Sequence, residues 1–562
     1  MTARRILARE MQHLRAFVLL KGTASAVPLY SQNRVAALAA EVIVLRTQTL
    51  LTVFLTLCLC FATSCRTPPP PPGTIVILLE SSPNNLDLRQ GTDAQSERVG
   101  ALLFDPLVKK DAHFNLQPWL ATSWDHPDPL TWIFHLRDGV RFHDGRPLEA
   151  ADVAWTIQSL TDPALTAHLP GGTLLSAKAS SFAGIAHIDT PDRLIVVLHL
   201  SRPDPALLFN LSDGLFGVVP RNSGAGLGLH PIGSGPYRFL SQTQDKEVVL
   251  ERAPNCWSGT APYASLQFNV VPDAVTSALE LQKGSADAAS NVLTPDMTYS
   301  LRNSHTVQIS DTPGSNIWYL NFNTADPTLA DRRIRQSIAY AIDRPAIVAS
   351  IWRNQAQLAT GTLLPSNSWA ATSPADLMQY PHDPARAIAL LESAGLHPDA
   401  HGIRLRVNIK ISTGEQERLL AAALQQQLRE AGIALSIRSA EFGTFYSDVT
   451  RGAFQLYPLK WIGSNEDPDI FRYLYSSASL PPRGANRGHY INPRIDALLA
   501  QAAAESGPDA QTRRRADYIA IQKILAIDLP TIPLWFPSST LVHSARLPHA
   551  TANPSGNFDF LR

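Results

Sequence analysis

Side chains able to support catalysis are present in this chain, but not in a catalytic arrangement. His143-Asp144 and His230 near Ser234 supply the residue types of a Ser-His-Asp hydrolase. The chain contains no G-x-S-x-G segment, the tight turn that exposes a nucleophilic serine. His143-Asp144-Gly145 is instead typical of a turn between a strand and a helix. We therefore predict no catalytic residue and no enzyme activity, and a lipid-anchored hydrolase is the less favoured alternative.

The sequence also argues against cofactor, metal and nucleic-acid sites. Gly224, Gly226 and Gly228 form a glycine-rich stretch that lacks the G-x-G-x-x-G spacing of a dinucleotide site. The histidines stand singly, without the convergence of His, Cys or carboxylates that metal ligation needs. The 48 basic and 48 acidic side chains cancel, which removes a broad electrostatic attraction to nucleic acid. We predict no cofactor, no metal and no nucleic-acid partner.

Residues 131–153 combine a strand, two turns and the start of a helix. Trp132, Phe134 and Leu136 alternate with less apolar positions, the period-two pattern of a sheet with one buried face. Asp138-Gly139 and Asp144-Gly145 then mark turns. From Glu149 onward the period lengthens, and one helical face carries apolar side chains at positions 153, 157 and 160.

Further segments alternate between strands and helices, which predicts an α/β protein. The expected strands include residues 74–79, 194–200, 405–411 and 531–536. Asp383-Pro384 predicts a capped helix start and Gly395 its left-handed end. Thr413 and Gln416 have the spacing of a capping box for the next helix, which is expected to end at Gly432 and to bury Leu420, Leu424 and Leu428.

The strand–turn–helix block closely resembles the signature region of the bacterial extracellular solute-binding proteins of family 5, the peptide and nickel receptors of ABC importers. The segment Leu120-Ala121-Thr122-Ser123-Trp124 belongs to the same resemblance. Other matching segments follow in the family's order along nearly all of the mature chain, although Cys256 stands where an aromatic residue is usual. These segments are residues 231–237, 251–257, 319–323, 331–336, 341–344, 461–469 and 486–496.

The resemblance implies a two-lobed periplasmic-binding-protein fold of type II with an extra subdomain, mixed sheets flanked by helices, and a ligand cleft between the lobes. The length of 562 residues agrees with more than one core. The family pattern predicts a discontinuous lobe I at residues 74–104, 232–310 and 528–562. A subdomain would be inserted at residues 105–231, and lobe II would span residues 311–527.

The resemblance also indicates where a ligand would bind. In peptide-binding relatives, an aspartate three residues after the cleft tryptophan pairs with the ligand's α-amine; the corresponding pair here is Trp461 and Ser464, so this carboxylate is missing. The loop at residues 412–414 offers no arginine for a ligand carboxylate. A zwitterionic dipeptide is therefore disfavoured. The candidate ligand-binding residues are Trp461, Ser464, Asn465, Asn316, Trp318, Trp369, Thr92, Asp93 and Ala94, whereas Trp132, Trp155 and Trp257 are expected in the core.

The N-terminal segment predicts export. Residues 46–65 have the shape of a lipoprotein signal peptide, with an apolar run that is too short to span a bilayer and Cys65 as the lipidated residue. An ordinary signal cleaved near Ser64 is the alternative. Residues 66–73 read as a proline-rich linker. Residues 1–45 form an extension that we attribute to a translation start assigned too far upstream. Cys256 then remains alone, so no intramolecular disulfide is possible.

These expectations define a receptor and not an enzyme. The chain is predicted to capture peptides or peptide-like solutes at the periplasmic or cell-surface face, held to the membrane by lipid on Cys65. Its partners would be the permease and ATPase subunits of an ABC importer, and the receptor itself would be a monomer. A sugar or a metal chelate as ligand, and a role in presenting ligand to a membrane sensor, remain alternatives.

Overall fold

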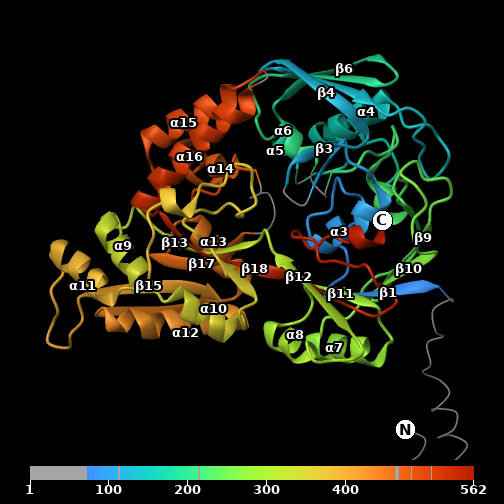
Figure 1. Ribbon diagram of the computed structural model, residues 1–562. Coiled ribbons are helices and arrows are strands. Elements are labelled where there is room, and N and C mark those ends of the chain that lie inside the picture. The colour runs from blue at the N-terminus through green and yellow to red at the C-terminus, as the bar shows by residue number, and fades with distance from the viewer. Residues whose placement is uncertain are drawn as a thin grey trace, which may run out of the picture. The chain divides into compact units, whose positions relative to one another are not determined.

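The computed structural model describes residues 73–562 except 112–113, 177, 213–215, 462–466, 482–483 and 508 (Figure 1). These residues belong to a compact unit that begins at Pro72. The predictions for the signal segment, Cys65 and the linker up to residue 72, and for Ser464 and Asn465, lie outside the described residues. None of the helices in the described part of the chain has both the length and the apolar character needed to cross a bilayer.

A 12-stranded mixed sheet organises the unit. Ten of its strands follow one path, and two further strands, β12 (Gln308–Pro313) and β14 (Ala356–Leu358), both pair with β18. In spatial order the path is β16 (Ile433–Ala440), β15 (Leu405–Ser412), β17 (Leu456–Trp461), β13 (Ile317–Phe322), β18 (Thr531–His543), β11 (Ala288–Ser290), β1 (Thr74–Leu79), β10 (Ser265–Val270), β9 (Glu247–Arg252) and β8 (Tyr237–Thr243).

Strand β18 belongs to both halves of this sheet (Figure 1). Its first part, from Thr531 to Trp535, pairs with β13. From Ser538 to His543 it pairs with β12, and its last residues also pair with β11. Within the described residues, the chain crosses between the two halves of the sheet at one other place, the short link from β12 to β13. In that link a Cβ atom on Gly314 would lie 2.3 Å from the carbonyl oxygen of Pro537, so the two crossing segments approach too closely for a side chain.

The length of β18 differs from the expected strand at residues 531–536. Pro537-Ser538-Ser539 has the composition of a strand end. The strand nevertheless continues to His543, because its second part finds new partners in β12 and β11 after β13 has ended. The other expected strands agree with β1, β7 (Ile195–Leu200) and β15 to within a residue.

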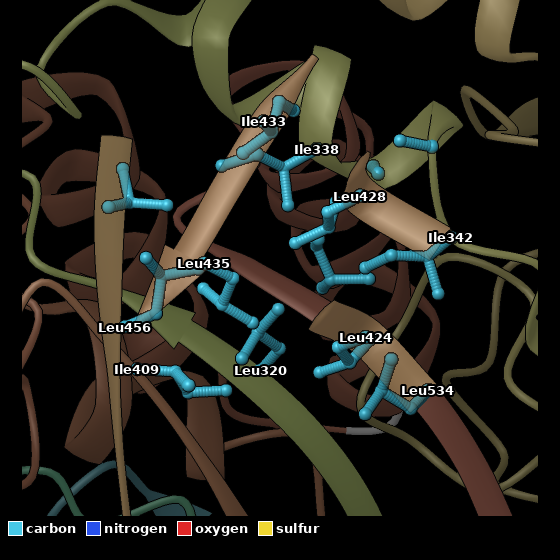
Figure 2. Close-up of a cluster of buried hydrophobic side chains, with 14 of the residues drawn as sticks. Leu320, Ile338, Ile342, Ile409, Leu424, Leu428, Ile433, Leu435, Leu456 and Leu534 are labelled. Carbon is cyan, nitrogen blue, oxygen red and sulfur yellow. The ribbon is translucent and has the colours of Figure 1, made fainter. Parts of the chain in front are cut away.

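The core around β13, β15 and β16 is mostly aliphatic, and Figure 2 shows the part of it that is built from leucine and isoleucine. Leu320 and Ile409 from the strands meet Leu424 and Leu428 from α12 (Glu415–Glu430). Residues Leu420, Leu424 and Leu428 are buried as predicted. The predicted capping box is wrong: the N-cap is Gly414 and has no side-chain cap, because β15 continues through Ser412 and leaves position 413 in the turn.

A separate antiparallel sheet lies within residues 105–231. Its order is β4 (Ala121–Asp128), β5 (Thr131–Leu136), β7 and β6 (Ile185–Asp192). The predicted strand, turns and helix are confirmed: β5 is followed by Gly139 and Gly145 at positive φ, and Glu149 caps α4 (Ala150–Thr161) in a capping box with Asp152. The domain boundaries themselves stay a prediction.

Helices cover the sheets and carry the predicted end signals. Asp383 caps α11 and Gly395 follows it at positive φ, as expected. The remaining longer helices are α3 (Ala94–Leu103), α7 (Ala274–Lys283), α8 (Pro295–Leu301), α9 (Arg332–Tyr340), α10 (Arg344–Ile351), α11 (Pro384–Ser393), α13 (Phe442–Thr450), α14 (Ile470–Tyr475), α15 (Pro493–Ala504) and α16 (Ala510–Asp528).

Candidate solute-binding site

A cleft of about 920 Å³, called the main cleft below, lies between the four-stranded sheet and the pair α15 and α16. One wall consists of β4, β5 and the segment Asp204 to Phe209. Residues of α15 and α16 and of the turn between them, together with Trp369 and Asp467, form the other wall. This volume falls in the range that encloses a small molecule or a short peptide.

Aromatic rings line both walls of the main cleft. His126 stacks on Trp132 with ring centroids 3.8 Å apart and an angle of 7° between the planes. On the opposite wall, Trp369 packs edge-on against Tyr518 at 6.3 Å. The guanidinium of Arg514 lies 5.4 Å from the Trp369 ring centroid. Flat aromatic surfaces of this kind accept ligand groups of varied chemistry.

A cluster of acidic side chains meets Arg514 at one end of the cleft. Arg514 lies 4.0 Å from the carboxylate of Asp467 and donates a hydrogen bond to the carbonyl oxygen of Pro205 at 3.3 Å. Behind Asp467, the carboxylate of Asp469 accepts from the Tyr518 hydroxyl at 3.0 Å and pairs with Arg472 at 3.1 Å. Arg514 therefore links the two walls of the cleft.

Burial and mutual repulsion perturb these carboxyl groups. Burial raises the pKa of Asp204 to about 6, and the neighbouring Asp469 carboxylate adds to the effect. Burial likewise raises the pKa of Asp467 to about 6, with Arg514 opposing and Asp469 and Asp204 reinforcing the shift. Negative charge at this end of the cleft is therefore only partly compensated by protein cations.

We expect these two carboxyls to lower stability as the pH rises. Because their pKa is about 6 in the folded chain and near 3.8 otherwise, their stabilising contribution is complete below about pH 4 and is lost as the pH rises through about 6. Between pH 4.5 and 7.5 the wild type should lose on the order of 4 kcal/mol more stability than the Asp204→Asn/Asp467→Asn double variant, about 2 kcal/mol for each carboxyl, as measured by urea unfolding. Parallel pH profiles for the two proteins would contradict this assignment.

The structure places the predicted ligand residues in different surroundings. Trp369 lines the main cleft. Trp461, the last residue of β17, pairs in register with Ile317, so it lies beside Asn316 at the start of β13. The indole nitrogen of Trp461 is buried and has no hydrogen-bond partner among the described residues. Trp461 and Asn316 thus lie together next to the crossing strands, outside the lining of the main cleft.

Trp318 differs from its expected position in the cleft. It is 2 % exposed and belongs to the aliphatic core around β13. Its ring packs edge-on against Trp352 at 5.7 Å. Alternation along β13 places the side chain of Trp318 on the helix-covered face of the sheet. Of the three tryptophans expected in the core, Trp132 is buried there and also lines the cleft. Trp155 and Trp257 are partly buried and pack against the edge of the core.

The polar side chains of the loop at residues 92–94 form hydrogen bonds with nearby groups of the protein. Asp93 caps α3 by accepting from the backbone N–H groups of Gln95 and Ser96. The hydroxyl of Thr92 accepts from the side-chain amide of Asn84 at 2.8 Å, and Ala94 is the first residue of α3. None of the three residues lines the main cleft.

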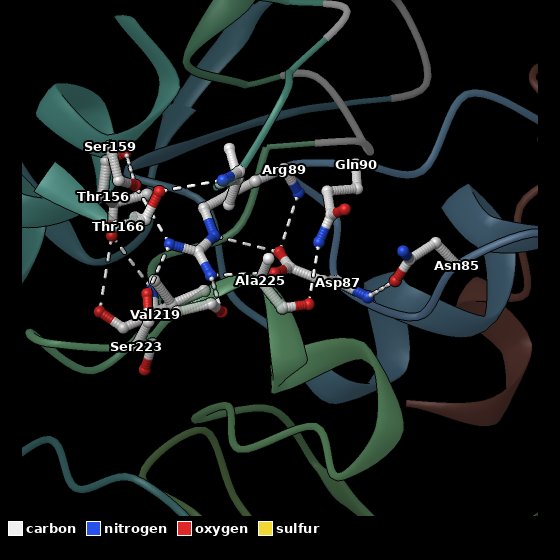
Figure 3. A network of polar contacts seen from close by, with 12 residues as sticks. Asn85, Asp87, Arg89, Gln90, Thr156, Ser159, Thr166, Val219, Ser223 and Ala225 are labelled. Atoms are coloured by element: carbon white, nitrogen blue, oxygen red, sulfur yellow. Dashed lines mark hydrogen bonds and ion pairs between the residues drawn. The ribbon is translucent and has the colours of Figure 1, made fainter. Parts of the chain in front are cut away.

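A buried arginine secures the same loop (Figure 3). The guanidinium of Arg89 uses all five N–H groups, two of them toward Asp87 at 3.0 and 2.8 Å. The others reach the hydroxyl of Ser159 on α4 and the carbonyl oxygens of Ser223 and Gly224, at 2.9 to 3.0 Å. The glycine-rich stretch that begins at Gly224 therefore contacts an internal cation.

The side chains with catalytic potential have other partners. Ser234 donates its hydroxyl proton to the carboxylate of Asp105 at 2.9 Å. The imidazole of His143 contacts the carbonyl oxygen of Gly235 at 3.0 Å, and Asp144 pairs with Arg146. The described residues contain no group of three or more His, Cys, Asp or Glu side chains that could hold a metal ion.

Several lining residues were not identified from the sequence. His126, Asp204 and Arg514 come from three segments without a shared motif, and each reads locally as an ordinary surface residue. The pair Asp204-Pro205 carried only a turn signal. Three-dimensional proximity is the observation that groups them.

A two-lobed fold with a solute-sized cleft defines a class of binding proteins, and comparisons identify the family. The model of the bacterial extracellular solute-binding proteins, family 5, middle part, matches residues 115–480. The chain belongs to this family, so the predicted fold class and family are confirmed. Proteins of this family are extracellular.

Relatives match along most of the chain. The probable di/tripeptide-binding protein 5 of Pseudomonas aeruginosa is 29 % identical over 506 residues, which cover 86 % of this chain and 94 % of that protein. The glutathione-binding protein GsiB of Escherichia coli K12 is 26 % identical over 498 residues, covering 86 % and 93 %. The structure of NikZ from Campylobacter jejuni in complex with Ni(L-His) superposes with a TM-score of 0.71 at 25 % identity, covering 87 % and 98 %.

Proposed function

We propose that this protein is the receptor of an ABC importer that captures peptides or peptide-like solutes in the main cleft and releases them unaltered to a permease. The observation that carries the proposal is the main cleft itself, about 920 Å³ in volume and lined by aromatic rings and hydrogen-bonding groups. Family membership and the names of the peptide- and glutathione-binding relatives support the choice of ligand class.

The proposal also includes the transport partners of the receptor and the absence of bond cleavage. Permease and ATPase subunits would receive the solute and supply the energy, and the receptor would act as a monomer anchored by lipid on Cys65. Reversible binding without bond cleavage is supported by Ser234 and His143, whose polar groups are engaged by Asp105 and Gly235. Movement of the lobes would be accommodated where β18 and the link before β13 cross between the half-sheets.

Calorimetry on the chain from Arg66 onward, which contains the whole compact unit, tests this proposal. We expect heat of binding with tri- and tetrapeptides, and no binding with a disaccharide or nickel–histidine. Mass spectrometry of the recovered solute should show it unchanged. A cleaved peptide, or binding restricted to the sugar or the chelate, would overturn the proposal.

Trp369→Ala should weaken peptide binding about ten- to a hundredfold, because it removes an aromatic wall of the main cleft. Trp369→Phe should retain most of the affinity. Tyr299→Ala is the matched control, since Tyr299 is 60 % exposed on α8 and lies outside the cleft lining. Equal peptide affinity in the wild type and in Trp369→Ala would place the binding site elsewhere.

A further inference from the structure

The charged groups that line the main cleft are unequal in number. Four carboxylates, those of Asp125, Asp204, Asp467 and Glu505, accompany one guanidinium, that of Arg514. Two of the acids have partners of their own: Asp125 contacts the imidazole of His135 at 2.9 Å, and Glu505 pairs with Arg513. The remaining pair, Asp204 and Asp467, is the part of the lining whose charge needs explanation.

Asp204 and Asp467 are poorly compensated by protein cations. Asp204 accepts a hydrogen bond from the backbone N–H of Ala206 at 3.0 Å, and among the described residues Arg202 and Arg472 attract its carboxylate only from beyond ion-pair distance. Asp467 is 6 % exposed and lies 4.0 Å from Arg514, a long distance for an ion pair. The Asp204 carboxylate reinforces the raised pKa of Asp467, which indicates that the two lie near each other. A buried carboxylate without a close cation is costly.

His126 contributes an acceptor to the wall that also carries Asp204. Its Nε2 atom is buried and has no hydrogen-bond partner among the described residues. Burial lowers the pKa of the imidazole, and a contact to the backbone of Pro129 opposes that effect. Because Nε2 has no partner among the described residues, the contact to Pro129 involves Nδ1. In a neutral ring, Nε2 then carries a free lone pair that can accept a hydrogen bond. This atom requires a donor that the described protein does not supply.

Aromatic faces complete the environment. Trp132 lies stacked under His126, and Trp124 and Trp369 also line the cleft. The faces of indole rings attract cations. Arg514 is the one cation among the described lining residues, and it is already engaged by Asp467 and the carbonyl of Pro205. The lining thus offers acceptors and π-faces to a cation and leaves little for an anion.

We propose that the main cleft selects solutes that carry a positive charge, with Asp204 and Asp467 receiving the cationic group and His126 accepting a hydrogen bond from the same solute. This inference rests on the proposed function and adds a specificity to it. A lysine or arginine side chain, or another ammonium on a peptide-like solute, has the required charge and donors. A solute with a matching negative charge would be rejected by the same two carboxylates.

Three tripeptides test the proposal by calorimetry at pH 7.5 on the chain from Arg66 onward. Ala-Lys-Ala, Ala-Gln-Ala and Ala-Glu-Ala share termini and backbone and differ in the charge of the central side chain. We expect Ala-Lys-Ala to bind about tenfold more tightly than Ala-Gln-Ala, and Ala-Glu-Ala to bind about tenfold more weakly. Equal affinities for the three peptides, or the reverse order, would overturn the charge selection while leaving the proposed receptor function in place.

Variants test whether Asp204 and Asp467 cause the preference for the cationic peptide. In the Asp204→Asn/Asp467→Asn double variant, the affinity ratio of Ala-Lys-Ala to Ala-Gln-Ala should fall from about ten to about one. Measurable binding of Ala-Gln-Ala then reports that the cleft is intact. Glu430→Gln on α12 is the matched control, because Glu430 is an exposed acid outside the lining. A preference for Ala-Lys-Ala that survives in the double variant would exclude these two carboxylates. Absence of binding by all three peptides in the wild type would instead reject the proposed peptide receptor, and this inference with it.

Discussion

Asp105→Ala should lower the free energy of unfolding by about 3–5 kcal/mol, because it removes a fully buried carboxylate and leaves four buried or half-buried donors without their acceptor. The Asp105 side chain is 0 % exposed. Its carboxylate accepts from the indole N–H groups of Trp119 and Trp257 at 2.8 and 3.0 Å. It also accepts from the hydroxyl of Ser234 and pairs with Arg562, the last residue of the chain, at 2.8 Å.

The ionised state of Asp105 is essential to this arrangement. Burial alone would raise the pKa of its carboxyl, but Arg562 and the two indole N–H groups hold the pKa below its ordinary value. Because the folded pKa is lowered, the stability that Asp105 provides is present at neutral pH and is lost as the pH falls into the acid range. Four segments that are distant in the sequence therefore depend on one charge.

Urea unfolding monitored by tryptophan fluorescence and by circular dichroism measures the effect of Asp105→Ala. Asp376→Ala serves as the control, since Asp376 is an exposed acid in a short 3-10 turn, and its loss should change stability by less than about 0.5 kcal/mol. A loss below about 1 kcal/mol in Asp105→Ala would mean that the four donors find other acceptors.

Arg89→Met should also cost about 3–5 kcal/mol, since it removes one partner of a buried ion pair. Asp87 would remain buried with its charge uncompensated, and two carbonyl oxygens and the Ser159 hydroxyl would lose a donor (Figure 3). Arg89→Lys should recover only part of the loss, because an ammonium cannot supply five N–H groups in a plane. The same variants should loosen the loop that precedes α3.

A bidentate ion pair on the surface provides the control for Arg89. Arg193 forms two parallel hydrogen bonds with Asp138, both at 2.8 Å, but both side chains are more than half exposed. Arg193→Met should therefore cost less than about 1 kcal/mol. Similar losses for the buried and the exposed arginine would show that burial does not set the strength of these contacts. Hydrogen exchange of residues 84–96 would report the loosening of the loop directly.

The sequence carries enough information for most local structure. β1 begins and ends at the expected residues, and β5 does so where alternation of apolar residues indicated a strand. The cap at Asp383, the helix start after Glu149 and the left-handed glycines after the helices also lie where expected. These features depend on side chains and backbone groups only a few positions apart, so short segments determine them. The family match extends the same information to the overall fold, because the motifs occur in one order.

Only the tertiary structure decided how long β18 is, which tryptophans are buried and which residues line the main cleft. β18 continues past Pro537 because β12 offers it a second partner, and Trp318 is buried because Trp352 packs against it. His126, Asp204 and Arg514 meet only after three distant segments have packed. Each of these outcomes depends on contacts between residues far apart in the chain. The local sequence pattern around a residue does not indicate which distant residue will contact it.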